Sequence, residues 1–189
     1  MMRIVVTGGM GSGKSMVTAA MRKMLPHYHI YDYDVAVHSQ YFHAEVKAFL
    51  TELCGTHVRN EVSTIVHADP DKKERLIDFM RPRLSAEFLA LSVSPNVVFD
   101  VPLFFEMQDR GDPVPAVDYI ICVTAPMPLR MERIRTRDHK SDKQIQRILD
   151  TQLPDSEKIR RSSATIINDG TVDQLYIKVT QLLTDLRVV

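Results

Sequence analysis

The chain has 189 residues, of which 44% are hydrophobic and 25% are charged. This size and composition predict one domain, residues 1–189, with the core of an ordinary globular protein. Lysine plus arginine and aspartate plus glutamate each number 24, so no overall positive field attracts nucleic acid. The first apolar run is too short for a signal peptide or a membrane span, and Cys54 and Cys122 are expected to be reduced thiols. We therefore expect a cytoplasmic protein, monomeric or weakly self-associating, that binds neither nucleic acid nor membrane.

The order of apolar runs and turn residues predicts alternating strands and helices. In chain order we expect a strand over 4–6, a helix over 15–25, a strand over 29–34, helices over 35–53 and 69–91, strands over 96–101 and 119–123, helices over 129–138 and 142–152, a strand over 164–167 and a helix over 172–186. Gly55 is expected to stop one helix, and Pro82 to kink the next. Strands that alternate with helices indicate an α/β fold with a parallel sheet of five strands.

A glycine-rich segment follows the first expected strand. Residues 8–15 read GGMGSGKS and match the phosphate-loop pattern G-x-x-x-x-G-K-[ST]. Glycines let backbone N–H groups approach phosphate oxygens, and the helix that follows directs its positive end at the same place. Lys14 is expected to reach the β- and γ-phosphates of ATP, and the Ser15 hydroxyl to bind Mg²⁺. The expected nucleotide-binding residues of this loop are Gly9, Met10, Gly11, Ser12, Gly13, Lys14, Ser15 and Met16. The sequence therefore predicts a three-layer P-loop NTPase fold.

Two further groups of charged residues favour a small-molecule kinase over a switch or a motor. Asp32 and Asp34, two residues apart, are expected to project from one face at the end of the second strand. Arg133 and Arg137, four apart, lie on one face of an expected helix and are candidates to close over phosphates. No Asn-Lys-x-Asp motif for reading guanine is present. Arg130 and Arg135 are expected on the solvated side of the same helix.

The sequence resembles the dephospho-CoA kinase family along most of its length. The opening TGGMGSGKS is similar to the family's phosphate loop, YDYDVA at 31–36 to its D-A-D-x-[IV]-A element, and FDVPLFFE at 99–106 to its D-[IV]-P-L-L-[FV]-E segment. ERIRTRD at 132–138 resembles the family's lid helix, and INDG at 167–170 its turn near the adenine. Gln152 occupies the place of a family glutamine. The departures are Arg81-Pro82 where the family has His-Pro, Ser162-Ser163 where it has Ala-Asp, and a shortened region from 55 to 66.

The resemblance implies an ATP-dependent kinase that transfers the γ-phosphoryl group to the ribose 3′-hydroxyl of dephospho-CoA. By analogy with shikimate kinase, Asp34 would accept or orient the hydroxyl proton and Asp32 would hold Mg²⁺; the reverse assignment stays open. Arg133 would act with Lys14 in transfer, and Arg137, Asn168 and Gly170 would contact the nucleotide. A helical insertion at about 35–95 would bind the acceptor, and a lid would span about 126–152. The expected acceptor-binding residues are Asp34, Arg81, Asp100, Leu103 and Glu106.

Two alternatives remain at this point. A (deoxy)nucleoside monophosphate kinase of the same fold is one, because Arg81 supplies a cation that could meet a substrate phosphate. A nucleotide-binding module without activity is the other. The complete set of Lys14, Ser15, Asp32 and Asp34 favours an active enzyme over the module.

Overall fold

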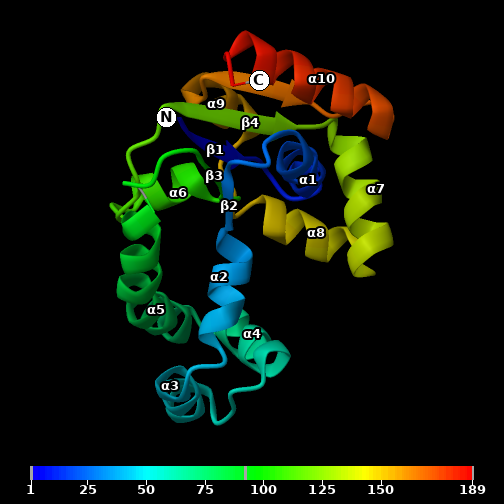
Figure 1. Ribbon diagram of the computed structural model, residues 1–189. Helices are drawn as coiled ribbons and strands as arrows, with labels where there is room; N and C mark the ends of the chain where they lie inside the picture. The colour runs from blue at the N-terminus through cyan, green and yellow to red at the C-terminus, as the bar shows by residue number, and fades with distance from the viewer. Residues whose placement is uncertain (1, 92, 189) are drawn as a thin grey trace.

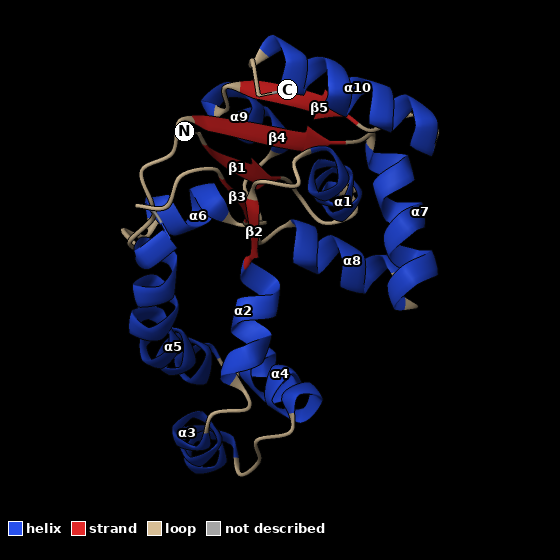
Figure 2. Cartoon of the chain, in the orientation of Figure 1, coloured by secondary structure: helices blue, strands red, loops and turns tan. Residues whose placement is uncertain are grey.

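A five-stranded sheet forms the centre of the computed structural model, which describes residues 2–91 and 93–188. The sheet has the order β2-β3-β1-β4-β5, and every pairing between neighbours is parallel (Figure 2). The strands are β1 (Arg3–Thr7), β2 (His29–Asp32), β3 (Val97–Asp100), β4 (Tyr119–Thr124) and β5 (Ala164–Ile167). The predicted α/β fold with a parallel sheet is therefore confirmed.

The strands bury side chains on both faces, as expected of a parallel sheet covered by helices. In β1, Ile4 and Val6 face α1 (Lys14–Met24) and α10 (Val172–Asp185), while Val5 faces the other way. All three side chains are fully buried. This alternation gives two apolar cores, one on each side of the sheet.

A group of four helices extends away from the sheet. The helices are α2 (Tyr33–Gln40), α3 (Ala44–Cys54), α4 (Arg59–Ala68) and α5 (Pro70–Leu91). Figure 1 shows α2 and α5 leading from the sheet to α3 and α4 at the far end. The single helix predicted over 35–53 is wrong, because α2 ends at Gln40 and α3 begins at Ala44. Helix α4 lies where the sequence predicted no element, and α5 continues past Pro82 to Leu91.

Short helices connect the remaining strands. They are α6 (Phe104–Asp109), α7 (Met127–Asp138), α8 (Asp142–Leu149) and α9 (Asp155–Arg161). Helix α8 begins with a capping box between Ser141 and Gln144 but ends three residues before the predicted limit at Gln152. Helix α9 was not predicted. In the described part of the chain no helix is both long and apolar enough to cross a membrane, and Cys54 and Cys122 are free thiols.

The end of β2 differs from the prediction in a way that affects function. The strand stops at Asp32, and Tyr33 already begins α2. The Asp32 side chain caps that helix, since its Oδ1 accepts a hydrogen bond from the Val35 N–H at 3.0 Å. The prediction that the two carboxylates share one face of a strand is therefore wrong. Asp32 is the helix cap, and Asp34 lies in the first turn of the helix.

Candidate active site

The phosphate loop runs from the carboxyl end of β1 into α1, where P-loop folds bind phosphate. Gly11 and Gly13 have φ values of 78° and 89°, in the left-handed region that glycine adopts without strain. A Cβ atom on Gly13 would also collide with the side-chain amide of Asn168. Gly13 caps α1, so the unpaired N–H groups of the first helical turn open at this loop.

Side chains from other elements hold three consecutive carbonyl groups of the loop. Arg130 Nε donates to the Met10 oxygen at 2.8 Å, Arg133 donates to the Gly11 oxygen at 3.4 Å, and Asn168 Nδ2 donates to the Ser12 oxygen at 2.9 Å. Gln152 Oε1 in turn accepts from the Met10 N–H at 3.0 Å. A carbonyl oxygen would repel a phosphate. Because side chains outside the loop bind these three oxygens, the loop is suited to bind an anion.

Arg130 is the main correction to the sequence-based view of α7. Its side chain is only 3% exposed, whereas the sequence placed it on a solvated face. Besides Met10, the guanidinium binds both carboxylate oxygens of Asp155 in α9 at 2.9 Å. Arg135 does lie on the surface, where it pairs with Asp142. Arg130 thus joins the base of α7, α9 and the phosphate loop, which makes it a positioning residue.

Replacing Arg130 by methionine is expected to weaken ATP binding. The change would free the Met10 carbonyl and leave Asp155 with Thr124 as its remaining hydrogen-bond donor among the contacts described here. Loss of a charge-assisted hydrogen bond of about 1.5–3 kcal/mol corresponds to a KM for ATP raised about tenfold or more. Steady-state kinetics measures this. The surface variant Arg135→Met is the matched control, and an equal rise in both variants would contradict the assignment.

Lys14 and Asp100 form an ion pair at the carboxyl ends of the central strands. Lys14 Nζ binds Asp100 Oδ1, and the Thr18 hydroxyl donates to Asp100 Oδ2 at 2.8 Å. The Asp100 side chain is only 4% exposed. Asp100 lies beside Val6 on one side and Asp32 on the other in the sheet register. Both carboxylate oxygens of Asp100 are therefore bound to residues of α1. Lys14 lies where its ammonium group can leave Asp100 and bind phosphate oxygens.

A cavity of about 900 Å³ opens between the phosphate loop, α7 and the start of α2. The loop residues from Gly8 to Met16 line one side, and Arg133 and Arg137 of α7 line another. Five residues on the remaining side come from α2 and from the segment that follows β3: Tyr33, Asp34, Pro102, Leu103 and Met107. The predicted loop, Asp34, Leu103 and both α7 arginines thus meet at one cavity.

Asp34 is an exposed residue that lines this cavity. Partial desolvation by the neighbouring protein atoms raises the pKa of its carboxyl above the usual value, and the negative charges of Asp32 and Asp100 add to the rise. Lys14 acts in the opposite direction and lowers this pKa. A carboxylate with a raised pKa that faces a phosphate-binding loop is typical of a general base.

Three residues predicted to contact the nucleotide, Asn168, Arg137 and Gly170, differ in their positions relative to the cavity. Asn168 is buried and holds the loop in place. Its side-chain amide donates to the Ser12 oxygen, and its backbone N–H donates to the Thr124 oxygen at 2.8 Å. Arg137 pairs with Asp138 at 2.6 Å at the cavity edge. Gly170 is exposed and lies outside the described lining of the cavity.

Glu106 and Arg81 also lie outside the lining of the main cavity as described. Glu106 Oε1 binds the fully buried Lys158 at 2.8 Å and accepts from the Leu153 N–H at 2.9 Å, which ties α6 to α9. Arg81 binds Asp112 at 2.8 Å and Asp78 at 3.2 Å. Direct contact of Glu106 or Arg81 with an acceptor therefore stays a prediction.

Sequence reasoning did not assign a role to several residues that shape the site. Arg130 was missed because its partners, Met10 and Asp155, lie far from it in the chain. Thr18 was missed for the same reason, since its partner is Asp100. Tyr33 and Met107 line the cavity without a motif that marks them. Gln152 was noticed by its place in the family pattern, and its bond to the Met10 N–H supplies the physical reason.

Comparisons with known proteins agree with this geometry. The family model for dephospho-CoA kinase matches residues 2–174. Proteins named dephospho-CoA kinase from Thermosynechococcus vestitus and Rhodopseudomonas palustris are 31% and 30% identical, with 96% and 97% of this chain and 93% and 94% of theirs covered.

Solved structures show the same fold. A protein from Thermus thermophilus has a TM-score of 0.77 at 27% identity, with 98% of this chain and 97% of that chain covered. The dephospho-CoA kinase from Campylobacter jejuni has a TM-score of 0.67 at 19% identity, with 97% and 96% covered. On the family match and the sequence identity, this chain belongs to the dephospho-CoA kinase family.

Proposed function

We propose that the protein transfers the γ-phosphoryl group of ATP to the ribose 3′-hydroxyl of dephospho-CoA. The observation that carries the proposal is the position of Asp34, which lines the same cavity as the phosphate loop. Family membership supports the choice of acceptor. The two free cysteines fit a cytoplasmic setting, where thiols stay reduced.

In the proposed reaction the phosphate loop holds ATP and Lys14 leaves Asp100 for the phosphates. The acceptor hydroxyl gives its proton to Asp34, its oxygen bonds to the γ-phosphorus, and the bond from that phosphorus to the bridging oxygen of ADP breaks. Arg133 and Arg137, which line the same cavity, would balance negative charge on the transferred group. Arg133 already binds the Gly11 and Asn168 oxygens, so its guanidinium is held near the loop.

The residues at the site suit Mg²⁺, which prefers oxygen ligands and keeps several waters when it binds phosphates. The Ser15 hydroxyl lies on the cavity wall next to Lys14, and Asp32 lies beside Asp100 at the strand ends. Among the described residues no cluster of three or more His, Cys, Asp or Glu side chains forms a metal cage. We propose that Ser15 and Asp32 hold the ion together with ATP, whose phosphate charge it would neutralise.

Arg81 no longer favours the alternative of a nucleoside monophosphate kinase. Its guanidinium is bound by Asp112 at 2.8 Å and by Asp78 at 3.2 Å. A substrate phosphate would have to displace these carboxylates, which would leave the Asp112 side chain, 6% exposed, without one of its two arginines. We therefore prefer an acceptor whose reacting group is a hydroxyl.

The rate is expected to depend on pH through Asp34. A base must be unprotonated, and partial desolvation raises the pKa of Asp34, so kcat/KM should fall as the pH drops through a value above the usual Asp range near 4. A pH–rate profile measures this limb. Asp34→Glu is the control that keeps a carboxylate, and a limb that stays in place in that variant would contradict the assignment to Asp34.

The position of the new phosphate gives a direct chemical test. Phosphorus NMR and mass spectrometry of the product are expected to show a single ribose 3′-phosphate. A 2′-phosphate, or a longer phosphate chain at the 5′ position, would overturn the proposed reaction while leaving the ATP site as described.

A further inference from the structure

A buried ion pair joins α6 to α9, and neither of its residues takes part in the proposed reaction. The Lys158 side chain is fully buried, the Glu106 side chain is 12% exposed, and Nζ of the lysine lies 2.8 Å from Oε1 of the glutamate. A buried ion pair is often no more stabilising than an apolar pair of the same size, because both charges lose their water. Stability alone therefore does not account for these two charges.

The same carboxylate fixes the backbone on one side of Gln152. Glu106 Oε1 accepts a hydrogen bond from the Leu153 N–H at 2.9 Å, and this N–H belongs to the planar peptide group that follows the Gln152 Cα. On the other side, the Gln152 N–H donates to the Leu149 oxygen at the end of α8 at 3.0 Å. Because both flanking peptide groups are hydrogen-bonded, the direction in which the Gln152 side chain leaves the backbone is set.

The Gln152 side chain reaches the phosphate loop. Its Oε1 accepts from the Met10 N–H at 3.0 Å, and Arg130 Nε donates to the Met10 oxygen at 2.8 Å. The third residue of the loop is thus bound at both its N–H and its carbonyl group. A displacement of Gln152 by about 0.6 Å would lengthen the Met10 bond beyond the useful range for N–H···O. The loop therefore depends on the exact position of Gln152.

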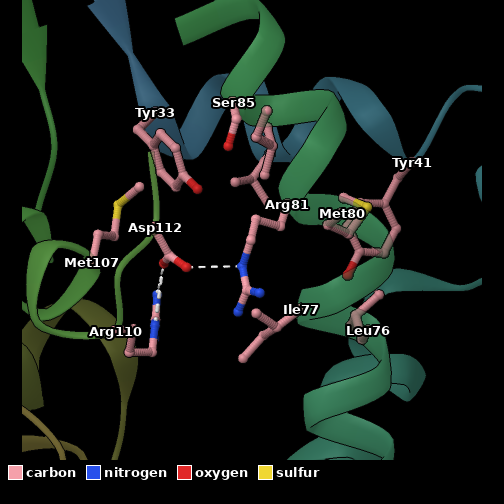
Figure 3. Close-up of a pocket in the computed structure, with 12 residues that line it drawn as sticks. Tyr33, Tyr41, Leu76, Ile77, Met80, Arg81, Ser85, Met107, Arg110 and Asp112 are labelled. Atoms are coloured by element: carbon pink, nitrogen blue, oxygen red, sulfur yellow. Dashed lines mark hydrogen bonds and ion pairs between the residues drawn. The ribbon is translucent and has the colours of Figure 1, made fainter. Parts of the chain in front are cut away.

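Helix α6 is also fixed at its other end, which gives Glu106 a firm support. The Asp112 N–H donates to the Met107 oxygen at 3.0 Å. The buried carboxylate of Asp112 binds Arg110 at 2.7 Å and Arg81 of α5 at 2.8 Å, as the dashed lines in Figure 3 mark. A carboxylate on α6 can therefore set the position of a neighbouring segment.

We propose that Glu106, oriented by Lys158, is a positioning residue for the nucleotide: it fixes Gln152, and Gln152 holds the phosphate loop at Met10 in the form that binds ATP. The inference rests on the proposed binding of ATP by this loop and makes no use of the acceptor. It gives a physical role to a glutamate that lies outside the described lining of the main cavity. Glu106 acts through Gln152 and touches neither ATP nor the acceptor.

The test uses two double variants, because a single change at either residue would leave a buried charge unpaired. Glu106→Leu/Lys158→Met replaces the ion pair by apolar side chains of similar size and leaves the Leu153 N–H without the oxygen that it binds. Glu106→Gln/Lys158→Met also removes both charges but keeps a side-chain oxygen for that N–H. A difference between the two proteins therefore reports on this hydrogen bond. Urea denaturation of both establishes that both are folded.

Mg·ADP is titrated into each protein by calorimetry, so the measurement does not depend on the acceptor. Glu106→Leu/Lys158→Met is expected to weaken Mg·ADP binding about threefold to tenfold, the worth of one hydrogen bond, and Glu106→Gln/Lys158→Met to stay within about twofold of the parent. Gln152→Met should weaken binding by at least as much as the first double variant. In the Gln152→Met protein, the further change to Glu106→Leu/Lys158→Met should then have an effect of less than about twofold.

Equal affinities of the two double variants for Mg·ADP would overturn the proposal, and so would full additivity with Gln152→Met. The KM for dephospho-CoA is measured in parallel and is expected to stay within about twofold in both double variants. A rise in this KM with unchanged Mg·ADP binding would show that Glu106 serves the acceptor instead. If the unaltered protein fails to turn over dephospho-CoA, the proposed function falls, and the calorimetry still decides the role of Glu106.

Discussion

Replacing Asp34 by asparagine is expected to lower kcat by a factor of about 10²–10⁴ while the KM for ATP stays within about twofold. Asparagine keeps the shape of the side chain but cannot accept the proton of the acceptor hydroxyl. Asp34 lines the same cavity as the loop, and no described hydrogen bond joins its side chain to the phosphate loop. Steady-state kinetics with dephospho-CoA, together with ATP titration, separates the two effects.

The stability of this variant serves as its first control. Since partial desolvation raises the folded-state pKa of the exposed Asp34, its charge opposes folding at neutral pH, and stability from this group falls as the pH rises through the folded pKa. The position in the first turn of α2 favours the same charge. These opposing effects predict a free energy of unfolding within about 0.5 kcal/mol of the parent, as for most exposed substitutions.

Asp32→Asn distinguishes the two possible assignments of the carboxylates. Asparagine caps helices as well as aspartate does, so the bond to the Val35 N–H and the fold should survive. If Asp32 binds the metal ion, Asp32→Asn should lose activity, and added Mg²⁺ should partly restore it. Asp34→Asn should show no such rescue. Rescue of Asp34→Asn and not of Asp32→Asn would reverse the two roles.

Lys14→Met is expected to be the other large loss, with kcat lowered by about 10³ or more because the cation that follows the transferred phosphoryl group is gone. It is also expected to destabilise the fold. Lys14 neutralises Asp100, whose side chain is 4% exposed, and removal of one partner of a buried pair costs about 3–5 kcal/mol. The loss is measured by urea denaturation beside the kinetics.

The double variant Lys14→Met/Asp100→Asn separates folding from chemistry. Without the unpaired carboxylate, most of the lost stability should return, and Thr18 can still hydrogen-bond the residue at position 100. Activity should remain as low as in Lys14→Met. Recovery of activity together with stability would show that Lys14 acts only through the fold.

The fold could be predicted where local sequence decides the structure. Strands β1, β3, β4 and β5 are built around short apolar runs, and β5 has the predicted limits, Ala164 to Ile167. Gly55 ends α3 with a φ of 75°, as its place after an apolar helix indicated. The division between α2 and α3 could not be seen, because residues 41–43 include neither Gly nor Pro. Helix α9 turns the buried Lys158 inward, so an apolar pattern cannot reveal it.

The residues with proposed chemical roles could be predicted from the sequence better than the residues that hold them in place. The glycine pattern pointed to the loop and Lys14, and the family pattern pointed to Asp34 and Arg133, all of which line one cavity. Arg130 looks like any other surface arginine in the sequence, and only the position of Asp155 in space shows that it is buried. The Lys158–Glu106 pair is similar, since its members lie 52 residues apart, at positions 106 and 158.

The most direct test of the central claim is the release of ADP from Mg·ATP, measured with dephospho-CoA and in parallel with the common nucleoside monophosphates. The Asp34 carboxylate lines the same cavity as the phosphate loop, and two carboxylates bind Arg81, so we predict turnover that depends on dephospho-CoA. Turnover with a nucleoside monophosphate and none with dephospho-CoA would contradict the account.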